Sequence, residues 1–146
     1  MDQSTKEKFM QAALLEGRKA LPDCLPNPPV GCVIVKDGQI VARGHTSIPG
    51  KPHAEAMALE RLSPGIEDFT MFVTLEPCSF QGRTPSCAKA IVRSKVKDVY
   101  VGILDPHPKN NGAGIAILES ANIEVHMGIL TDQVEKDLHP YLIKTI

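Results

Sequence analysis

The chain alternates between short apolar runs and segments in which apolar residues recur at helical spacing. Strands are predicted where apolar residues follow one another almost without interruption, because such runs are typical of strands buried on both faces. The first run, residues 30–35, is followed by Asp37-Gly38, a dipeptide that favours a two-residue hairpin turn. The predicted strands are residues 30–35, 39–43, 70–75, 98–104 and 123–126.

The other periodic segments favour helices. Residues 5–21 place Phe9, Ala12 and Ala13 near one face, and Pro22 cannot continue that helix. A hairpin followed by alternating helices and strands predicts an α/β sandwich, in which one mixed sheet carries helices on both faces. The predicted helices are residues 5–21, 53–62, 85–94, 114–120 and 131–143.

Composition and charge narrow the class of protein. With 146 residues, 42% of them hydrophobic and 23% charged, residues 1–146 are expected to form a single globular domain. The net charge is −1 and no basic cluster stands out, which argues against nucleic acid as a partner. No apolar run resembles a signal sequence or a membrane span, so we expect a soluble, cytoplasmic protein that does not contact membranes.

Two short segments combine the side chains that a zinc site needs. Residues 52–55 read PHAE, and a second segment runs from Cys78 to Cys87. His53, Cys78 and Cys87 supply one nitrogen and two sulfur ligands, which leaves the fourth tetrahedral position open for water, as in catalytic zinc sites. Both thiols are predicted close to helix starts, where exposed N–H groups favour thiolates. We therefore predict one Zn²⁺ ion per chain.

Glu55 is the predicted catalytic residue. Bound zinc lowers the pKa of water to about 7, and a carboxylate beside that water can carry protons to a ring nitrogen and to departing ammonia. His53 and Glu55 are two residues apart and do not share a helix face. In the first turn of a helix, however, both side chains can reach a site beyond the helix end. This arrangement predicts a zinc-dependent hydrolytic enzyme, and deamination is one reaction that it could carry out.

A structural zinc site is the alternative from another class of protein. Such a site requires four protein ligands, and Cys24, His45, His107 or His126 could supply the fourth. The chain would then be a non-catalytic binding module. Cys24 and Cys32 lie in a proline-rich loop and in an apolar strand, where an intracellular cysteine is usually a small buried hydrophobic residue.

The pairing of His-x-Glu with Pro-Cys…Cys resembles the zinc-dependent nucleobase and nucleotide deaminases of the cytidine deaminase superfamily. Eight residues separate Cys78 from Cys87, and they include Gly82-Arg83-Thr84-Pro85. This longer form is most similar to the pyrimidine deaminases of the riboflavin pathway. Further similar segments are PNPPVGCVIV at 26–35, GKPHAE at 50–55, VTLEPC at 73–78 and DPHP at 105–108.

The resemblance implies a fold, a reaction and partners. The implied fold is the cytidine-deaminase-like three-layer α/β/α sandwich around a mixed five-stranded sheet. The implied reaction releases ammonia from an amino-pyrimidine ribosyl phosphate or a related small amino-heterocycle. The resemblance also implies a homodimer or homotetramer. By their place in the family's motifs, the implied substrate-binding residues are Asn27, Arg83, Thr84, Asp105 and His107.

The chain departs from the family pattern only at positions that the resemblance places around the substrate pocket. Thr46, Phe80, Gln81 and His107 stand where the family usually has other residues, whereas the metal set and Glu55 match. A deaminase acting on another base, nucleoside or nucleotide is therefore a second hypothesis. Many family members also continue into a reductase domain, which we do not expect within this chain.

Overall fold

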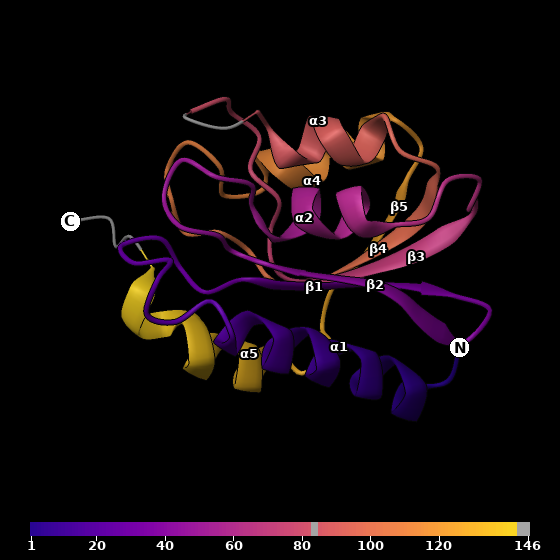
Figure 1. Cartoon of the computed structure of the whole chain (residues 1–146), viewed down its shortest axis with the longest axis horizontal. Helices are drawn as coiled ribbons and strands as arrows, with labels where there is room; N and C mark the ends of the chain where they lie inside the picture. The colour runs from indigo at the N-terminus through magenta and orange to yellow at the C-terminus, as the bar shows by residue number, and fades with distance from the viewer. Residues whose placement is uncertain (83–84, 143–146) are drawn as a thin grey trace.

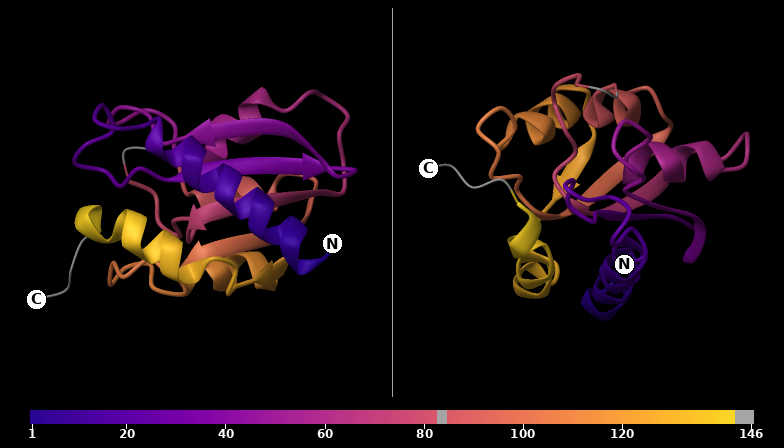
Figure 2. Two further views of the ribbon diagram at one scale, coloured as in Figure 1. Left: turned by 90° about the horizontal axis from the view of Figure 1, so that it is seen from below. Right: turned by 60° about the vertical axis from the view of Figure 1, so that its left-hand side comes forward.

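The computed structural model describes residues 1–82 and 85–142, and in it helices cover both faces of one central sheet (Figure 1). The strands are β1 (Gly31–Lys36), β2 (Gln39–His45), β3 (Phe69–Leu75), β4 (Val96–Ile103) and β5 (Glu124–His126). The helices are α1 (Gln3–Arg18), α2 (Ala54–Arg61), α3 (Cys87–Val92), α4 (Ala113–Ser120), α5 (Thr131–Leu138) and the 3-10 turn η1 (His139–Tyr141). Helices α2, α3 and α4 lie on one face, and α1 and α5 on the other (Figures 1 and 2).

The sheet is mixed and five-stranded, which confirms the predicted α/β/α sandwich. Its order is β2-β1-β3-β4-β5. Strand β1 runs antiparallel to both β2 and β3, while β3, β4 and β5 are parallel. Parallel neighbours end at the same edge of a sheet, where α/β proteins usually place their ligands. The ends of β3 and β4 therefore bring the segments after Leu75 and Ile103 side by side, as their pairing in the register shows.

The hydrophobic core occupies both sides of the sheet. All residues of β1 except Lys36 are buried, as expected for an uninterrupted apolar run. Three aromatic side chains pack together between α1 and the sheet, with the rings of Phe72 and Tyr100 stacked at 4.6 Å and Phe9 5.5 Å from Phe72. No helix within residues 1–82 and 85–142 is long and apolar enough to cross a membrane.

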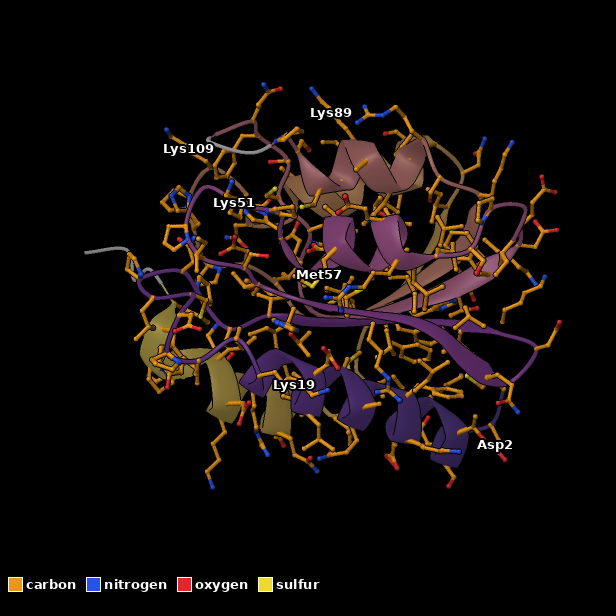
Figure 3. All side chains as sticks on the ribbon, viewed as in Figure 1. Asp2, Lys19, Lys51, Met57, Lys89 and Lys109 are labelled. Carbon is orange, nitrogen blue, oxygen red and sulfur yellow. The ribbon has the colours of Figure 1, made fainter. Side chains whose placement is uncertain are left out.

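Close backbone contact fixes α2 on the sheet. A Cβ atom at Gly44 of β2 would stand 2.6 Å from the backbone nitrogen of Ala58 and would also clash with the carbonyl of Ala54. Met57 of α2 points toward the sheet, and its Sδ accepts the backbone N–H of His45 at 3.4 Å (Figure 3). The start of α2 is thereby held against β2.

Helices α1 and α5 end three and five residues before their predicted C-terminal boundaries. Helix α1 ends at Arg18 and not at residue 21, because Leu21 precedes Pro22 and that position disfavours helical backbone. The closing helix was predicted to reach residue 143. It ends at Leu138 and continues as η1, because Pro140 lacks the N–H that a longer helix requires. Residue 143 lies outside the described residues.

Candidate active site

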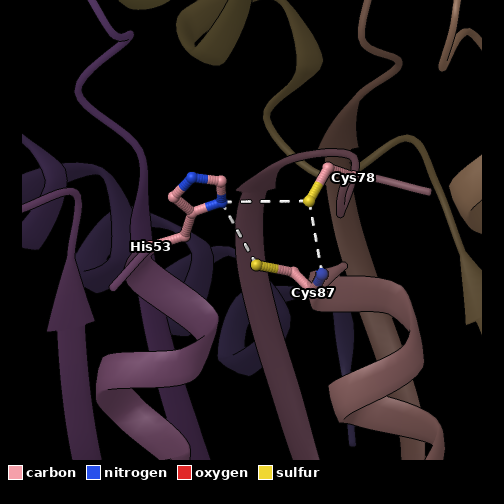
Figure 4. A group of neighbouring side chains, drawn as sticks. All are labelled: His53, Cys78 and Cys87. Carbon is pink, nitrogen blue, oxygen red and sulfur yellow. Dashed lines mark hydrogen bonds between the residues drawn. The ribbon is translucent and has the colours of Figure 1, made fainter. Parts of the chain in front are cut away.

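Three side chains from separate parts of the chain meet where the helices α2 and α3 begin (Figure 4). His53 is the N-cap of α2, Cys78 lies after β3, and Cys87 is the first residue of α3. The Nδ1 atom of His53 is 3.8 Å from Sγ of Cys78 and 3.3 Å from Sγ of Cys87. The structure thus brings the three predicted zinc ligands together.

The spacing of these atoms fits a zinc ion. Zn–S bonds of about 2.3 Å and Zn–N bonds of about 2.0–2.1 Å in a tetrahedron place nitrogen and sulfur ligands about 3.6 Å apart. The two distances from His53 lie on either side of this value. In addition, the backbone N–H of Cys87 donates to Sγ of Cys78 at 3.2 Å, which stabilises negative charge on that sulfur.

A fourth protein ligand is not found beside this group in the described part of the chain. Of the candidates, His45 places Nδ1 2.8 Å from a carboxylate oxygen of Glu16. His126 belongs to a separate group with Asp98 and Glu124 on the parallel side of the sheet. Cys24 is buried in its loop, as predicted. Three protein ligands are the number that catalytic zinc sites use.

The three ligands differ in how easily they ionise. A hydrogen bond from the Cys87 thiol lowers the pKa of Cys78 to about 4 against the effect of burial, and His53 adds to the lowering. The hydrogen bond with Cys78 raises the pKa of His53. The hydrogen bond to Cys78 and burial both raise the pKa of Cys87. Cys78 is therefore the first of the two thiols to lose its proton.

Glu55 lies against this cluster. It is the second residue of α2, and only 4% of it is exposed. The pKa of Glu55 is raised to about 7, first by burial and then by the negative charge of Cys78, while the nearby His53 acts in the opposite direction. A pocket of about 170 Å³ has Glu55, His53 and Cys78 in its wall. A carboxylate in this place can exchange protons with a molecule bound in the pocket.

Most of the predicted substrate residues line the same pocket. Asn27 comes from the loop before β1, while Asp105 and His107 come from the loop after β4. The other two predicted contacts, Arg83 and Thr84, lie outside the described residues.

The positions that depart from the family pattern have distinct surroundings. The hydroxyl of Thr46 donates to the carbonyl of Pro28 at 2.9 Å and accepts the N–H of Val30 at 3.0 Å, so Thr46 supports the loop that carries Asn27. The ring of Phe80 lies 5.5 Å from the imidazole of His107, and both line the pocket. Gln81 is exposed.

Sequence reasoning missed three residues that build the site. Glu76 accepts backbone N–H groups from Asp105 at 3.1 Å, Gly112 at 2.9 Å and Ile115 at 3.1 Å. An acidic residue directly after a buried strand was a signal for it. Asn110 is buried in the loop after β4, against the loop after β3, and Leu142 lines part of the pocket. Neither of these positions has a pattern of its own in the sequence.

The class of protein follows from the fold and the site together. Zinc-dependent deaminases combine an α/β/α sandwich with a His-Cys-Cys group at two helix starts and a buried glutamate beside it. Residues 3–103 match the family model of the cytidine and deoxycytidylate deaminase zinc-binding region. The chain belongs to this enzyme family, and zinc is the family's cofactor.

Similar proteins point to one branch of the family. The chain is 43% identical over 134 residues to riboflavin biosynthesis protein RibD of Chlamydia trachomatis, an alignment covering 92% of this chain and 36% of that protein. Among solved structures, RibD of Acinetobacter baumannii has a TM-score of 0.92 and 42% identity, over 97% of this chain and 40% of that one. A diaminohydroxyphosphoribosylaminopyrimidine deaminase/reductase of Thermotoga maritima has a TM-score of 0.88 and 39% identity, over 95% and 40%. The chain thus spans little more than a third of the length of these relatives.

Proposed function

We propose that this chain is a zinc-dependent hydrolytic deaminase acting on an amino-pyrimidine ribosyl phosphate of riboflavin biosynthesis or on a closely related amino-heterocycle. The observation that carries the proposal is the buried carboxylate of Glu55 in a pocket whose wall also holds His53 and Cys78. The name of the Thermotoga relative gives a pyrimidine deaminase activity, which supports the choice of substrate class.

In this proposal the residues divide into metal ligands and a proton carrier. His53, Cys78 and Cys87 hold the zinc ion, which when bound supplies Lewis-acid activation of the attacking water. The Glu55 carboxylate would accept a proton from that water while the water oxygen forms a bond to the amino-bearing carbon, and would give this proton to the adjacent ring nitrogen. It then passes the second proton of the water to the amine, which leaves as ammonia. One water is consumed and one ammonia is released.

The remaining pocket residues bind and orient the heterocycle. Asn27 and Asp105 offer hydrogen-bonding groups from opposite loops, and Phe80 with His107 offers ring faces against which a planar base can pack. Lys51 and Lys109 lie at the end of the molecule where the site loops gather, where they can attract a phosphate group (Figure 3).

A second candidate is a deaminase of another base, nucleoside or nucleotide. The family description itself names cytidine and deoxycytidylate, and Thr46, Phe80 and His107 differ from the riboflavin-pathway pattern. Because these side chains line the pocket and the metal ligands do not change, the alternative alters the substrate but not the reaction.

We further propose one deaminase domain that works in the cytoplasm as a homo-oligomer. All four cysteines are free thiols, which suits a reducing compartment. Large apolar side chains are exposed on the loops near the pocket, and a second copy of the chain would cover them: Leu25, Ile48, Phe80 and Leu104. Light scattering on the purified protein tests this, and a monomer at all concentrations would exclude the oligomer.

The function is tested by ammonia release from zinc-loaded protein, over a panel of amino-pyrimidines, purines, their nucleosides and their phosphates. We expect turnover of the phosphoribosylated amino-pyrimidine, and loss of at least about 10²-fold in kcat for Glu55→Gln with zinc retained. Glu60→Gln, an exposed carboxylate on the same helix, is the matched control. Silence over the whole panel would favour the non-catalytic binding module, and full activity of Glu55→Gln would exclude the proposed mechanism.

A further inference from the structure

Asn110 is the most completely bonded polar side chain near the site, and the proposed reaction does not use it. It lies in the loop between β4 and α4, and only 2% of it is exposed. It faces two parts of the site at once, the loop that carries Cys78 and the side chain of Asp105.

Both atoms of its amide make two hydrogen bonds. Oδ1 accepts the backbone N–H of Ser79 at 3.1 Å and of Gly114 at 3.2 Å. Nδ2 donates to the carbonyl of Pro77 at 3.2 Å and to Oδ2 of Asp105 at 3.2 Å. Pro77 and Ser79 are the chain neighbours of Cys78, so Asn110 forms hydrogen bonds with the backbone on both sides of that residue.

The partners determine which side chain can stand here. Two backbone N–H donors face Oδ1 of the Asn110 amide, and two oxygen acceptors face its Nδ2. The position therefore needs a side chain that carries an acceptor and an NH₂ donor on the same carbon, as an amide does. An aspartate has the same shape but would direct an oxygen at the carbonyl of Pro77 and at the Asp105 carboxylate. An apolar residue would leave buried backbone groups without partners, which is costly.

The surrounding backbone is packed to match. A Cβ atom at Gly114 would clash with the carbonyl of Pro77 and would stand 3.2 Å from Oδ1 of Asn110. The start of α4 therefore approaches the Cys78 loop closely. Asp105 also accepts the N–H of His107 at 3.0 Å through Oδ1, so that each carboxylate oxygen has one protein donor.

We propose that Asn110 is a positioning residue that couples the zinc-ligand loop to the pocket wall, holding Cys78 through its two neighbouring peptides and the Asp105 carboxylate through Nδ2. The role of Cys78 and Asp105 in this statement rests on the proposed function. Asn110 itself does not line the pocket, and acts only through these groups.

The test replaces Asn110 with aspartate and with alanine and measures zinc release to a chromogenic chelator at one fixed pH. We expect release at least about tenfold faster for both variants, the range typical when partners of metal ligands are lost. In ammonia-release assays KM should rise more than kcat falls, because Asp105 loses its donor while Glu55 is unchanged. Asn111→Asp is the matched control: the neighbouring residue is exposed, and the charge change is the same.

A second substitution separates positioning from a general loss of stability. In Asn110→Asp combined with Asp105→Asn, the new amide at position 105 can donate to the new carboxylate at 110, which removes the repulsion between two carboxylates but leaves an oxygen facing the carbonyl of Pro77. Zinc release should therefore be slower than in Asn110→Asp without returning to the wild-type rate, while KM stays high. If both Asn110 variants release zinc and bind substrate as Asn111→Asp does, within about twofold, the proposal is wrong. It is also wrong if the double variant releases zinc as fast as Asn110→Asp.

The zinc-release measurement uses no substrate. A panel on which the wild-type protein is silent would overturn the proposed function and leave the test of Asn110 intact. Conversely, an active wild-type enzyme with unchanged Asn110 variants would overturn only the positioning role.

Discussion

Cys87 illustrates what one residue contributes when a site is assembled from separate elements. In the proposed site it would supply a sulfur ligand from its side chain, and its backbone N–H donates a hydrogen bond to Sγ of Cys78. Because α3 begins at this residue, that N–H belongs to the unpaired groups of a helix start. The same residue thus offers one proposed ligand and stabilises another.

Replacement of Cys87 by alanine is expected to abolish stable zinc binding. Two protein ligands would remain from a set of three, and the described residues beside them offer no substitute. Metal analysis of the purified protein measures the loss. Cys24→Ala removes a buried thiol outside the site and should keep one zinc per chain. Full zinc in Cys87→Ala would show that the ligand set is wrong.

Glu16 is a buried carboxylate that ties stability to pH. Burial raises the pKa of Glu16, but hydrogen bonds from His45 at 2.8 Å and Lys19 at 3.1 Å outweigh it, and the net pKa lies below the ordinary value. A lowered pKa in the folded state means that the ionised form is stabilised by folding. This contribution is present above the ordinary carboxyl pKa of about 4.3 and is lost as the pH falls through the folded-state value.

Glu16→Gln is therefore expected to lower the free energy of unfolding by about 1–3 kcal/mol at neutral pH. The difference in the free energy of unfolding between wild type and variant should shrink as the pH falls below about 4.3, because the wild-type carboxylate is then protonated and no longer contributes its stabilising interactions. Urea unfolding at a series of pH values measures it, with exposed Glu67→Gln as the control. A difference that stays constant or grows toward acid would contradict the prediction.

At the scale of elements, the contact between β2 and α2 places the first turn of α2 in the site. Gly44→Ala would force the Cβ atom against the backbone of Ala54 and Ala58, which cannot move without shifting the helix start. We expect a loss of at least about 2 kcal/mol in the free energy of unfolding, together with weaker zinc binding through the displaced His53. Unfolding and metal titration measure both effects.

Gly82→Ala is the control for this change. Its added methyl group would have no described heavy atom within 4 Å, and its backbone is not in the left-handed region. The free energy of unfolding of Gly82→Ala should equal that of the wild type. If Gly44→Ala and Gly82→Ala were equally stable, the helix would not be held by this contact.

The elements themselves could largely be predicted from local pattern, and their ends could not. The uninterrupted apolar runs and the Asp37-Gly38 turn predict the strands because burial and turn geometry are encoded within a few residues. The third predicted helix began at residue 85. It begins at Cys87, because the Ser86 hydroxyl accepts the N–H of Lys89 at 3.3 Å and caps the helix there. Which of several neighbouring residues caps a helix depends on hydrogen bonds that the local sequence pattern does not reveal.

In the candidate site, too, some residues could be predicted from the sequence and others could not. His53, Glu55, Cys78 and Cys87 could be predicted because their chemistry requires those residue types at that spacing. Asn110 could not, since its role depends on four partners spread over residues 77–114. Leu142 likewise lines the pocket just after the 3-10 turn η1, a position that no local sequence pattern marks.

At the scale of the whole molecule, the proposed zinc ion links segments that are far apart in the sequence. His53 begins α2, Cys87 begins α3, and Cys78 follows the central strand β3. These three positions come together only when the sheet has formed and both helices are packed on it. Zinc should therefore bind the folded chain far better than the unfolded one, and it should stabilise the fold by mass action.

Removing zinc is accordingly expected to lower the melting temperature of the whole chain. Free zinc at about 100 times its dissociation constant adds about 2.7 kcal/mol, which for a chain of this size corresponds to about 5–10 °C. Calorimetry with added zinc and after chelation measures the shift. In Cys87→Ala the melting temperature should not respond to zinc, because the change removes a ligand and leaves the remaining contacts of the fold in place. A zinc-dependent shift of equal size in that variant would place the stabilising ion elsewhere on the molecule.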